Sequence, residues 1–223
     1  MVLTSLSQYI LTMLHTLICV ASLFVTIQGS ILARHFPRNV VEILSVDNGG
    51  PWGDWHESDF CADGTFASGY KMKIEPPQGD GDDTALNAIT LQCEDATKSL
   101  YGGQVRSGSG YWGDWSGLST CKFQTGTQDF LTAFSLQVEP PQGGSVDDTA
   151  ANFVKFMCRN LPATRNQYEL ALNPGKGVWG SYGGWSKTCP IQSAICGIQT
   201  RIEKPQGNND DTALNDVRFF CCV

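Results

Sequence analysis

The sequence contains no pair of cysteines in a Cys-x-x-Cys arrangement, and of its three histidines only His35 and His56 lie beyond residue 33. A structural zinc site needs several cysteine or histidine ligands at short spacings, and a Ser-His-Asp triad needs a histidine as its base. His56 directly follows Trp55, and we interpret it as a surface neighbour of that ring. We therefore predict no metal site, no cofactor and no serine-type catalysis.

Charge is missing from the start of the chain. No charged side chain precedes Arg34, and an apolar run extends over about Tyr9–Ile27, an order typical of a secretory signal peptide. We predict that residues 1–30 are this leader, with cleavage at about 29–33, and that residues 31–223 form one domain. Polar residues interrupt the run, which barely reaches the ~20 apolar residues that a membrane span needs. An uncleaved membrane anchor is the alternative, but we expect a secreted, extracellular protein without membrane contact after cleavage.

The formal net charge of −7 is carried entirely by residues after the leader, because residues 1 to 33 are uncharged. An acidic surface repels phosphate backbones, so nucleic acid is not an expected partner. Glycans and basic proteins remain compatible with this charge. The sequence also contains no Asn-x-Ser/Thr sequon, so N-glycosylation is not expected.

One segment occurs three times, at residues 74–87, 138–152 and 202–215. Each copy has a Pro-Gln-Gly turn followed by Asp-Asp-Thr-Ala and an asparagine. The Asp-Asp pairs begin at 82, 147 and 210, so the periods are 147 − 82 = 65 and 210 − 147 = 63 residues. A repeat of this length indicates three like supersecondary units that pack against one another. Residues common to all three copies are therefore expected to build the scaffold rather than one active site.

Each copy carries two segments in which apolar and polar residues alternate, and helical periodicity is nowhere convincing. The first segment comes just before the prolines, and its residues with apolar spacing are Tyr70, Met72 and Ile74, then Phe134, Leu136 and Val138, then Ile198, Thr200 and Ile202. The second follows the Asp pair, with Ile89, Leu91 and Cys93, then Val154, Phe156 and Cys158, then Val217, Phe219 and Cys221. This period of two predicts strands with one buried face and an all-β protein.

Nine cysteines are present, and removal of Cys19 with the leader leaves eight, an even number suited to four disulfides in an oxidising compartment. Cys61 and Cys189 both lie 14 residues before the glutamate that ends the first strand (75 − 61 and 203 − 189), so they are equivalent. This equivalence predicts the pairs Cys61–Cys93, Cys121–Cys158, Cys189–Cys221 and Cys196–Cys222. Adjacent residues on a strand face opposite ways, so exchange of the last two pairings stays open.

The segments at residues 48–55, 69–79 and 82–87 resemble the vitelline membrane outer layer protein I family, and the resemblance covers about residues 44–223. It implies a disulfide-stapled β-prism, in which three antiparallel, Greek-key-like sheets surround a pseudo-threefold axis and share one core. The three internal repeats are assigned to residues of about 44–100, 101–165 and 166–223.

The family takes its name from the outer coat of the yolk membrane of bird eggs, where it is a secreted structural component. Prism folds of this kind are shared with some plant lectins, and the family has been linked to the handling of chito-oligosaccharides, which is an analogy at the level of the fold. The third repeat departs from the pattern, because Lys204 replaces a proline and the Trp segment is longer. Symmetric sites are therefore expected to be less equivalent there.

Paired carboxylates invite a glycosidase interpretation, because that chemistry needs two carboxyl groups at a set separation. The paired acids are Asp82, Asp83, Asp147, Asp148, Asp210 and Asp211. Since they occur in triplicate, we interpret them as turn-fixing residues. Unique acids are the better catalytic candidates, with nothing to favour any one of Asp59, Asp63, Glu94, Asp95, Asp129 and Glu169. The cluster Asp80-Gly81-Asp82-Asp83 has the oxygens for calcium but no EF-hand spacing, so no calcium site is predicted.

All six tryptophans cluster two per repeat beside Asp and Gly residues. The candidate glycan-facing residues are Trp52, Asp54, Trp55, Trp112, Asp114, Trp115, Trp179 and Trp185. Indole faces can hold the C–H faces of sugar rings while carboxylates hold the hydroxyl groups. The alternative is that the indoles plug the ends of the core, and their recurrence at fixed positions favours plugging.

The sequence thus predicts a secreted structural or interaction protein of an extracellular coat, matrix or secretion. Its expected partners are extracellular glycans or coat glycoproteins, and basic proteins are a further option. A lectin-like binding module is the first alternative. A glycosidase or transglycosylase acting on chito-oligosaccharides through carboxylates is the second. The sequence does not predict an oligomeric state.

Overall fold

The computed structural model describes residues 38–79, 84–97, 100–141, 149–205 and 212–223, and the predicted leader lies outside these ranges. The described residues form sixteen strands and no helix, which confirms the predicted all-β fold. The strands are β1 (Val40–Leu44), β2 (Asp54–Trp55), β3 (Asp59–Phe60), β4 (Thr65–Ile74), β5 (Leu86–Asp95), β6 (Tyr101–Val105), β7 (Asp114–Trp115), β8 (Ser119–Thr120), β9 (Phe123–Gln124), β10 (Thr127–Gln128), β11 (Phe130–Val138), β12 (Ala151–Arg159), β13 (Tyr168–Leu170), β14 (Ser181–Tyr182), β15 (Ala194–Ile202) and β16 (Leu214–Cys222).

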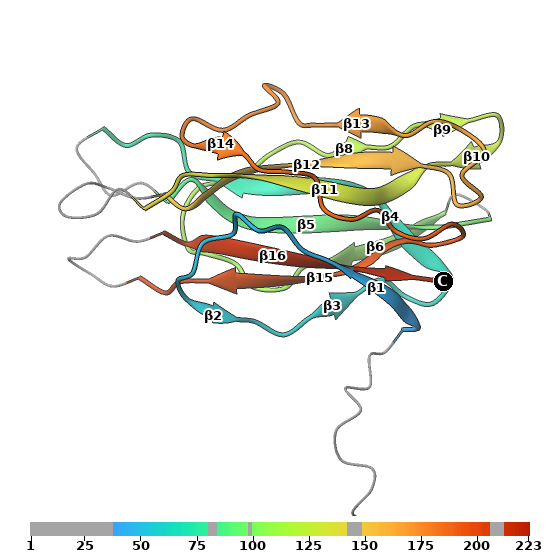
Figure 1. The fold of residues 1–223 in the computed structure, drawn as a ribbon, viewed down its shortest axis with the longest axis horizontal. Helices are drawn as coiled ribbons and strands as arrows, with labels where there is room; N and C mark the ends of the chain where they lie inside the picture. Colours follow the sequence, from blue (N-terminus) through green and yellow to red (C-terminus); the bar gives the residue numbers. More distant parts are fainter. Residues whose placement is uncertain (1–37, 80–83, 98–99, 142–148, 206–211) are drawn as a thin grey trace, which may run out of the picture. The chain divides into compact units, whose positions relative to one another are not determined.

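Three long antiparallel hairpins organise the strands into a β-prism (Figure 1). The first sheet has the order β6-β5-β4-β7, with β8 also paired to β4. The second has the order β13-β12-β11-β14, and the third has the order β1-β16-β15-β2, with β3 also paired to β15. A two-stranded ribbon, β9–β10, lies outside these sheets and was not predicted from the repeat.

Each sheet contains a short strand from another repeat. The strand β7 follows the first hairpin in the chain and pairs with β4, and β14 follows the second hairpin and pairs with β11. The strand β2, near the start of the domain, pairs with β15 of the last hairpin. The arrangement is therefore cyclic: each Trp-containing segment completes the sheet of the preceding hairpin, and the first segment completes the sheet of the last.

A glycine precedes each of these short strands, and the backbone there has no room for a side chain. The φ angles of Gly53, Gly113 and Gly180 are +76°, +80° and +70°. A Cβ atom at these positions would lie 2.2–2.3 Å from the backbone of Ile202, Ile74 and Val138, respectively. Both the left-handed conformation and the close approach of two backbones therefore require glycine.

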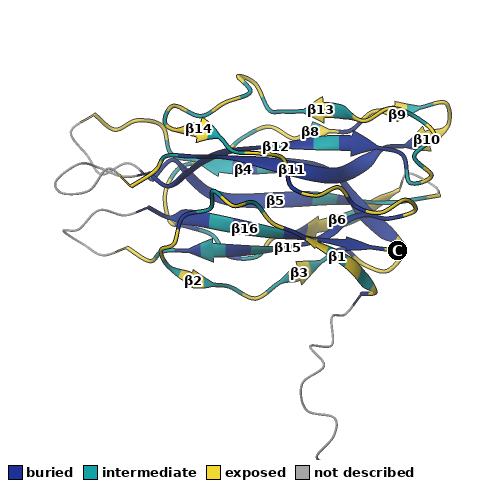
Figure 2. Ribbon diagram, in the orientation of Figure 1, coloured by how far each residue is buried: buried dark blue, intermediate teal, exposed yellow. Residues whose placement is uncertain are grey.

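The inner faces of the three sheets share one core. Tyr70, Phe156 and Phe219 come from three different sheets and are fully buried, with ring centroids 4.7 Å apart between Tyr70 and Phe156 and 5.1 Å apart between Phe156 and Phe219. Figure 2 shows that the long hairpin strands are mostly buried, whereas short outer strands such as β2, β3 and β9 are partly or fully exposed. Burial of each large side chain contributes roughly 1.5–3 kcal/mol, so packing between the sheets dominates the stability.

The prediction of one buried face per strand is wrong for β11, where every residue is buried. Segment 177–186 covers the outer face of this strand. Ser135 Oγ donates to the carbonyl of Gly183 at 3.0 Å, and Gln137 Nε2 donates to the carbonyl of Trp179 at 2.6 Å. The polar alternation predicted the strand correctly, but its polar side chains hold a covering segment rather than facing water.

Four disulfides are present. Three of them, Cys61–Cys93, Cys121–Cys158 and Cys189–Cys221, join a loop cysteine to a hairpin strand, and Cys196–Cys222 joins β15 to β16 within one sheet. The exchanged pairing of the last two bridges is not the one that the structure adopts. The paired cysteines are 32, 37, 32 and 26 residues apart in the sequence, respectively. Each bridge stabilises the fold by roughly 3–4 kcal/mol if it acts through the entropy of the unfolded chain.

Substitution of Gly113 by alanine is expected to lower the free energy of unfolding by at least ~2 kcal/mol, because it adds left-handed strain and a backbone clash. Gly117 is the matched control, since a Cβ there meets nothing within 4 Å. Guanidinium unfolding with the disulfides intact, followed by tryptophan fluorescence, measures both variants. Equal stability of Gly113→Ala and Gly117→Ala would contradict the close packing of Gly113 against the backbone of Ile74, where β7 pairs with β4.

Candidate functional site

A hydrogen-bonded clamp holds each Trp-containing segment against the hairpin that it completes. In the first sheet, Thr84 Oγ1 donates to the carboxylate of Glu75 at 2.6 Å, and Asn87 Nδ2 donates to Thr84 Oγ1 at 2.6 Å. The side-chain oxygen of Asn87 then accepts the backbone N–H of Trp112 at 3.2 Å. The clamp therefore joins the base of the hairpin loop to the segment that carries the tryptophan.

The same clamp occurs in the other two sheets. Its members there are Glu139, Thr149, Asn152 and the N–H of Trp179, and then Glu203, Thr212, Asn215 and the N–H of Trp52. The three asparagines are at most 1% exposed. The alanine after each threonine is left-handed, with φ of 47–49°, and its carbonyl accepts the N–H of the clamp glutamate at 2.8 Å. Such a conformation costs alanine about 1–2 kcal/mol and persists because the clamp imposes it.

The sequence interpretation missed the clamp. All six predicted turn-fixing aspartates lie outside the described residues, as does the cluster considered for calcium. The glutamate, threonine and asparagine of each copy also recur at nearly constant spacing, and that recurrence was the available signal. It did not reveal which distant tryptophan N–H each asparagine accepts, because the partner lies in the following repeat or, for Asn215, in the first.

The interpretation that the tryptophans plug the core is wrong. Trp52, Trp112, Trp115 and Trp185 are exposed, by 52%, 50%, 38% and 37%, and Trp55 and Trp179 are half-buried. The two aspartates of the candidate set, Asp54 and Asp114, are exposed in β2 and β7. The recurrence of the indoles at fixed positions therefore reflects the backbone that presents them, and not burial of their rings.

Cations lie over several of these rings on the outer faces of the sheets. The Arg218 guanidinium is 4.1 Å from the ring centroid of Trp55, and Arg106 is 5.5 Å from that of Trp115. Lys155 Nζ lies 5.1 Å from the centroid of Trp185. Each contact contributes about 0.5–1 kcal/mol at an exposed site and orients the ring on its sheet.

The Trp52 pocket is a cavity of about 400 Å³ between the third sheet and the second. Its walls are mainly apolar and come from five segments of the chain. The lining residues are Asn48, Gly49, Gly50, Pro51, Trp52, Val138, Glu139, Pro140, Pro141, Ala150, Ser181, Tyr182, Gly183 and Thr212. Two of these, Glu139 and Thr212, belong to clamps, so the scaffold hydrogen bonds hold the walls of this pocket in place.

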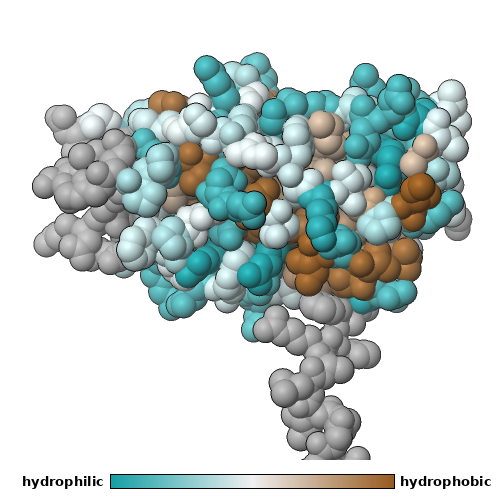
Figure 3. All heavy atoms as spheres, in the orientation of Figure 1, coloured by the Kyte–Doolittle hydropathy of each residue, from teal (hydrophilic) through white to brown (hydrophobic). Residues whose placement is uncertain are grey.

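The Trp185 pocket, of about 490 Å³, lies on the other side of Asn48 and is more polar. Its lining residues are Ile43, Ser45, Val46, Asp47, Asn48, Gly184, Trp185, Ser186 and Lys187. Figure 3 shows apolar surface near β1 and the C-terminal end, where Val41, Ile43 and Val223 are exposed. Ile43 joins this surface to the Trp185 pocket.

Two titratable groups beside the Trp52 pocket have shifted pKa values. Burial raises the pKa of Tyr182 well above its ordinary value, with smaller contributions from Tyr70 and Glu169, so its hydroxyl stays protonated and donates to the carbonyl of Gly175 at 2.9 Å. Burial also raises the pKa of Asp216, against the opposing effects of the Val217 N–H and two arginines. The carboxyl group of Asp216 occupies the space where a side chain on Gly49 would lie.

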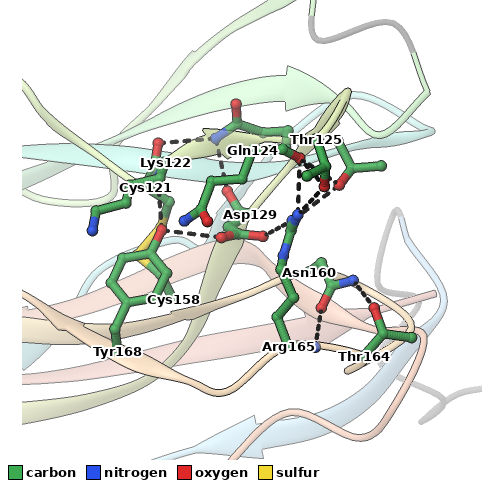
Figure 4. Close-up of polar contacts among 12 residues, drawn as sticks. Cys121, Lys122, Gln124, Thr125, Asp129, Cys158, Asn160, Thr164, Arg165 and Tyr168 are labelled. Carbon is green, nitrogen blue, oxygen red and sulfur yellow. Dashed lines mark hydrogen bonds and ion pairs between the residues drawn. A yellow bond between two sulfur atoms is a disulfide. The ribbon is translucent and has the colours of Figure 1, made fainter.

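None of the six unique acids considered as catalytic candidates lines either pocket. Asp129 is the most buried of them and is held by Arg165 and by the hydroxyl of Tyr168 (Figure 4). The pKa of Tyr168 is raised to about 12 by burial, and the N–H of Lys122 donates to its oxygen at 2.6 Å. This network ties the β9–β10 ribbon to β13 and is structural.

Within the described ranges, no three His, Cys, Asp or Glu side chains gather as metal ligands would. Nothing helical in that part of the chain is long and apolar enough to cross a bilayer.

Comparison with known proteins identifies the family. The model of the family described as vitelline membrane outer layer protein I matches residues 42–223. The chain belongs to this family. Vitelline membrane outer layer protein 1 homologues from Mus musculus and Homo sapiens are each 47% identical to it, over 190 and 183 residues. These alignments cover 85% and 81% of this chain, and 87% and 82% of the two relatives.

Solved structures of lectins align with this chain at low sequence identity. An artocarpin–mannopentose complex aligns with a TM-score of 0.49 and 12% identity over 83% of this chain and 99% of that chain. A mannose-specific jacalin-related lectin from Morus nigra, in complex with mannose, aligns with a TM-score of 0.46 and 14% identity over 87% of this chain and 100% of that chain.

Alkaline titration is expected to show a late step from the phenols of Tyr70, Tyr168 and Tyr182, whose folded-state pKa values are all raised. Unfolded tyrosine ionises near pH ~10, so the free energy of unfolding is unaffected below that pH and falls as the pH rises from ~10 towards the folded-state values. Near-ultraviolet absorbance of tyrosinate measures this, and Tyr182→Phe should remove part of the late step. Ionisation of all phenols in one step near pH ~10, in protein that is still folded, would contradict these environments.

Proposed function

We propose that the protein is a secreted structural component of an extracellular coat or matrix, which attaches to glycans or glycoproteins by non-covalent contact at the Trp52 pocket. The observation that carries this proposal is the position of Trp52, whose indole is half-exposed at a cavity with fixed walls. Ligand pockets are typically concave, mostly apolar and equipped with a few placed polar groups, and their volumes are of order 300–1,000 Å³.

The chemistry of the Trp52 pocket suits a sugar. The flat indole and the neighbouring prolines offer apolar surface to the C–H face of a pyranose ring. The carboxylate of Glu139 lies at the same cavity and can accept hydrogen bonds from hydroxyl groups. The Trp52 backbone is fixed by the Asn215 clamp at 3.3 Å, so little conformational entropy is lost on binding.

A role outside the cell is supported by the covalent framework. Four disulfides in one domain persist in oxidising compartments and are rare in the cytosol. Membership of the vitelline membrane outer layer protein I family agrees with a coat component. Each sheet also contains a short strand from another repeat, which ties the three sheets into one body. Such a body suits a structural component.

A glycan array probed with the wild-type protein and two variants tests the proposal. Trp52→Ala is expected to weaken binding at least tenfold, equivalent to about 1.4 kcal/mol, because the stacking surface is lost. Trp112→Ala is the matched control, since Trp112 occupies the equivalent place on another sheet, is equally exposed and does not line the pocket. Mass spectrometry after incubation with chito-oligosaccharides should show no turnover.

Three results would count against this function. Failure of the wild-type protein to bind any arrayed glycan would remove glycan attachment. Equal binding by Trp52→Ala and the wild type would place any glycan site elsewhere. Turnover of chito-oligosaccharides that a single carboxylate substitution abolishes would instead establish an enzyme.

A further inference from the structure

The Trp52 and Trp185 pockets adjoin each other along one seam of the prism, and Asn48 lines both. Each pocket has a single exposed indole, Trp52 on one side of Asn48 and Trp185 on the other. The seam runs between the β1–β2 connection of the third sheet and the segment that follows β14 in the second. Two cavities of about 400 and 490 Å³ therefore share one wall.

The side-chain amide of Asn48 is held in place, but only one of its two polar atoms is hydrogen-bonded within the described residues. Its Nδ2 donates to the carbonyl of Leu136 at 2.9 Å, and its amide fills the space beside Gly183, where a Cβ would lie 2.4 Å from the Asn48 side chain. The Oδ1 atom is buried and has no hydrogen-bond partner in the part of the chain that the structure describes. A buried acceptor without a partner is costly, so the described residues leave part of the hydrogen-bonding capacity of this wall unused.

The pseudo-symmetry shows that this seam is specialised. Counting back four residues from Trp52, Trp112 and Trp179 gives Asn48, Gly108 and Gly175, so only one copy places a side chain in the wall. The residue that faces this position also differs in size between the copies. Gly108 faces the large side chain of His56, whereas Asn48 faces Gly183. The residues that repeat build the clamps, and the residues that differ build the shared wall.

Trp185 is a second departure from symmetry. The N–H groups of His56, Ser116 and Gly183 donate to equivalent strand carbonyls, which aligns these three positions. The next cysteine follows after 61 − 56 = 5, 121 − 116 = 5 and 189 − 183 = 6 residues. The third copy thus has one additional residue, and the stretch containing it presents Trp185.

We infer that the two pockets form one extended site for an unbranched oligosaccharide, with successive sugar units at Trp52, across Asn48 and at Trp185. This inference rests on the proposed function and names the ligand class of the same site. Each indole supplies one stacking surface, and Asn48 lies between them in the wall that the two pockets share. Polar side chains that line the Trp185 pocket, those of Ser45, Asp47 and Lys187, offer donors and acceptors for the far end of the oligosaccharide.

A chain-length series tests this inference. Isothermal titration of the wild-type protein with one- to six-unit oligomers of N-acetylglucosamine and of mannose should show at least a tenfold gain in affinity between the monosaccharide and the tetrasaccharide of the sugar that binds. Trp185→Ala is expected to abolish this gain and to leave monosaccharide affinity within twofold. Trp115→Ala is the matched control, because Trp115 is equally exposed, also lies under a cation and lines neither pocket.

The outcomes separate this inference from the proposed function. Affinity that does not change with chain length, or a length gain that persists in Trp185→Ala, overturns the extended site while glycan attachment at Trp52 stands. Loss of all binding in Trp52→Ala together with loss of only the length gain in Trp185→Ala supports both. If neither the N-acetylglucosamine nor the mannose series binds, the titration is repeated with oligomers of the sugar that the glycan array identifies. If no glycan on the array binds, both proposals are overturned.

Discussion

The fold depends on one recurring constraint: a buried asparagine at the base of each hairpin accepts the N–H of a tryptophan that belongs to a different repeat. Asn87, Asn152 and Asn215 each bind one such N–H, at 3.0–3.3 Å. Because the segment after each tryptophan also adds a short strand to that hairpin, no sheet is complete within its own repeat. The first segment of the domain consequently depends on the last hairpin, and the two ends of the domain are held in the same sheet. Disulfides and the shared aromatic core then stabilise a topology that these contacts define.

Symmetry divides the molecule into scaffold and candidate site. Residues that recur, such as the clamp residues and the glycines before β2, β7 and β14, have backbone roles that are the same in every sheet. Residues that break the repeat gather at the seam between the second and third sheets, where Asn48, Gly183 and Trp185 have no counterparts of the same kind in the other copies. On a threefold scaffold, such departures make one seam different from the other two. The rigid backbone of the repeat supports the side chains that differ.

Much of the fold followed from the sequence because its signals are local. Alternation over about six residues predicts a strand with one buried face, so both hairpin strands of each copy were predicted. Two errors had one cause. The burial of Ser135 and Gln137 and the exposure of the tryptophans both depend on which segment covers which sheet, and a pattern of apolar and polar residues does not contain that information. The clamp was missed for the same reason, since its asparagine and its tryptophan are 25, 27 and 163 residues apart. The pockets could not be predicted at all, because a cavity depends on how two sheets meet.

The cyclic exchange of strands is tested most directly by amide hydrogen exchange in Asn215→Ala, measured residue by residue by NMR. The substitution removes the acceptor of the Trp52 N–H and leaves the other two clamps intact. Protection is expected to be lost at Trp52 and in the β2–β15 pairing, while the N–H groups of Trp112 and Trp179 keep the protection that they have in the wild type. Unchanged protection at Trp52, or equal loss at all three tryptophans, would contradict the claim that each segment is held by its own asparagine in the neighbouring hairpin.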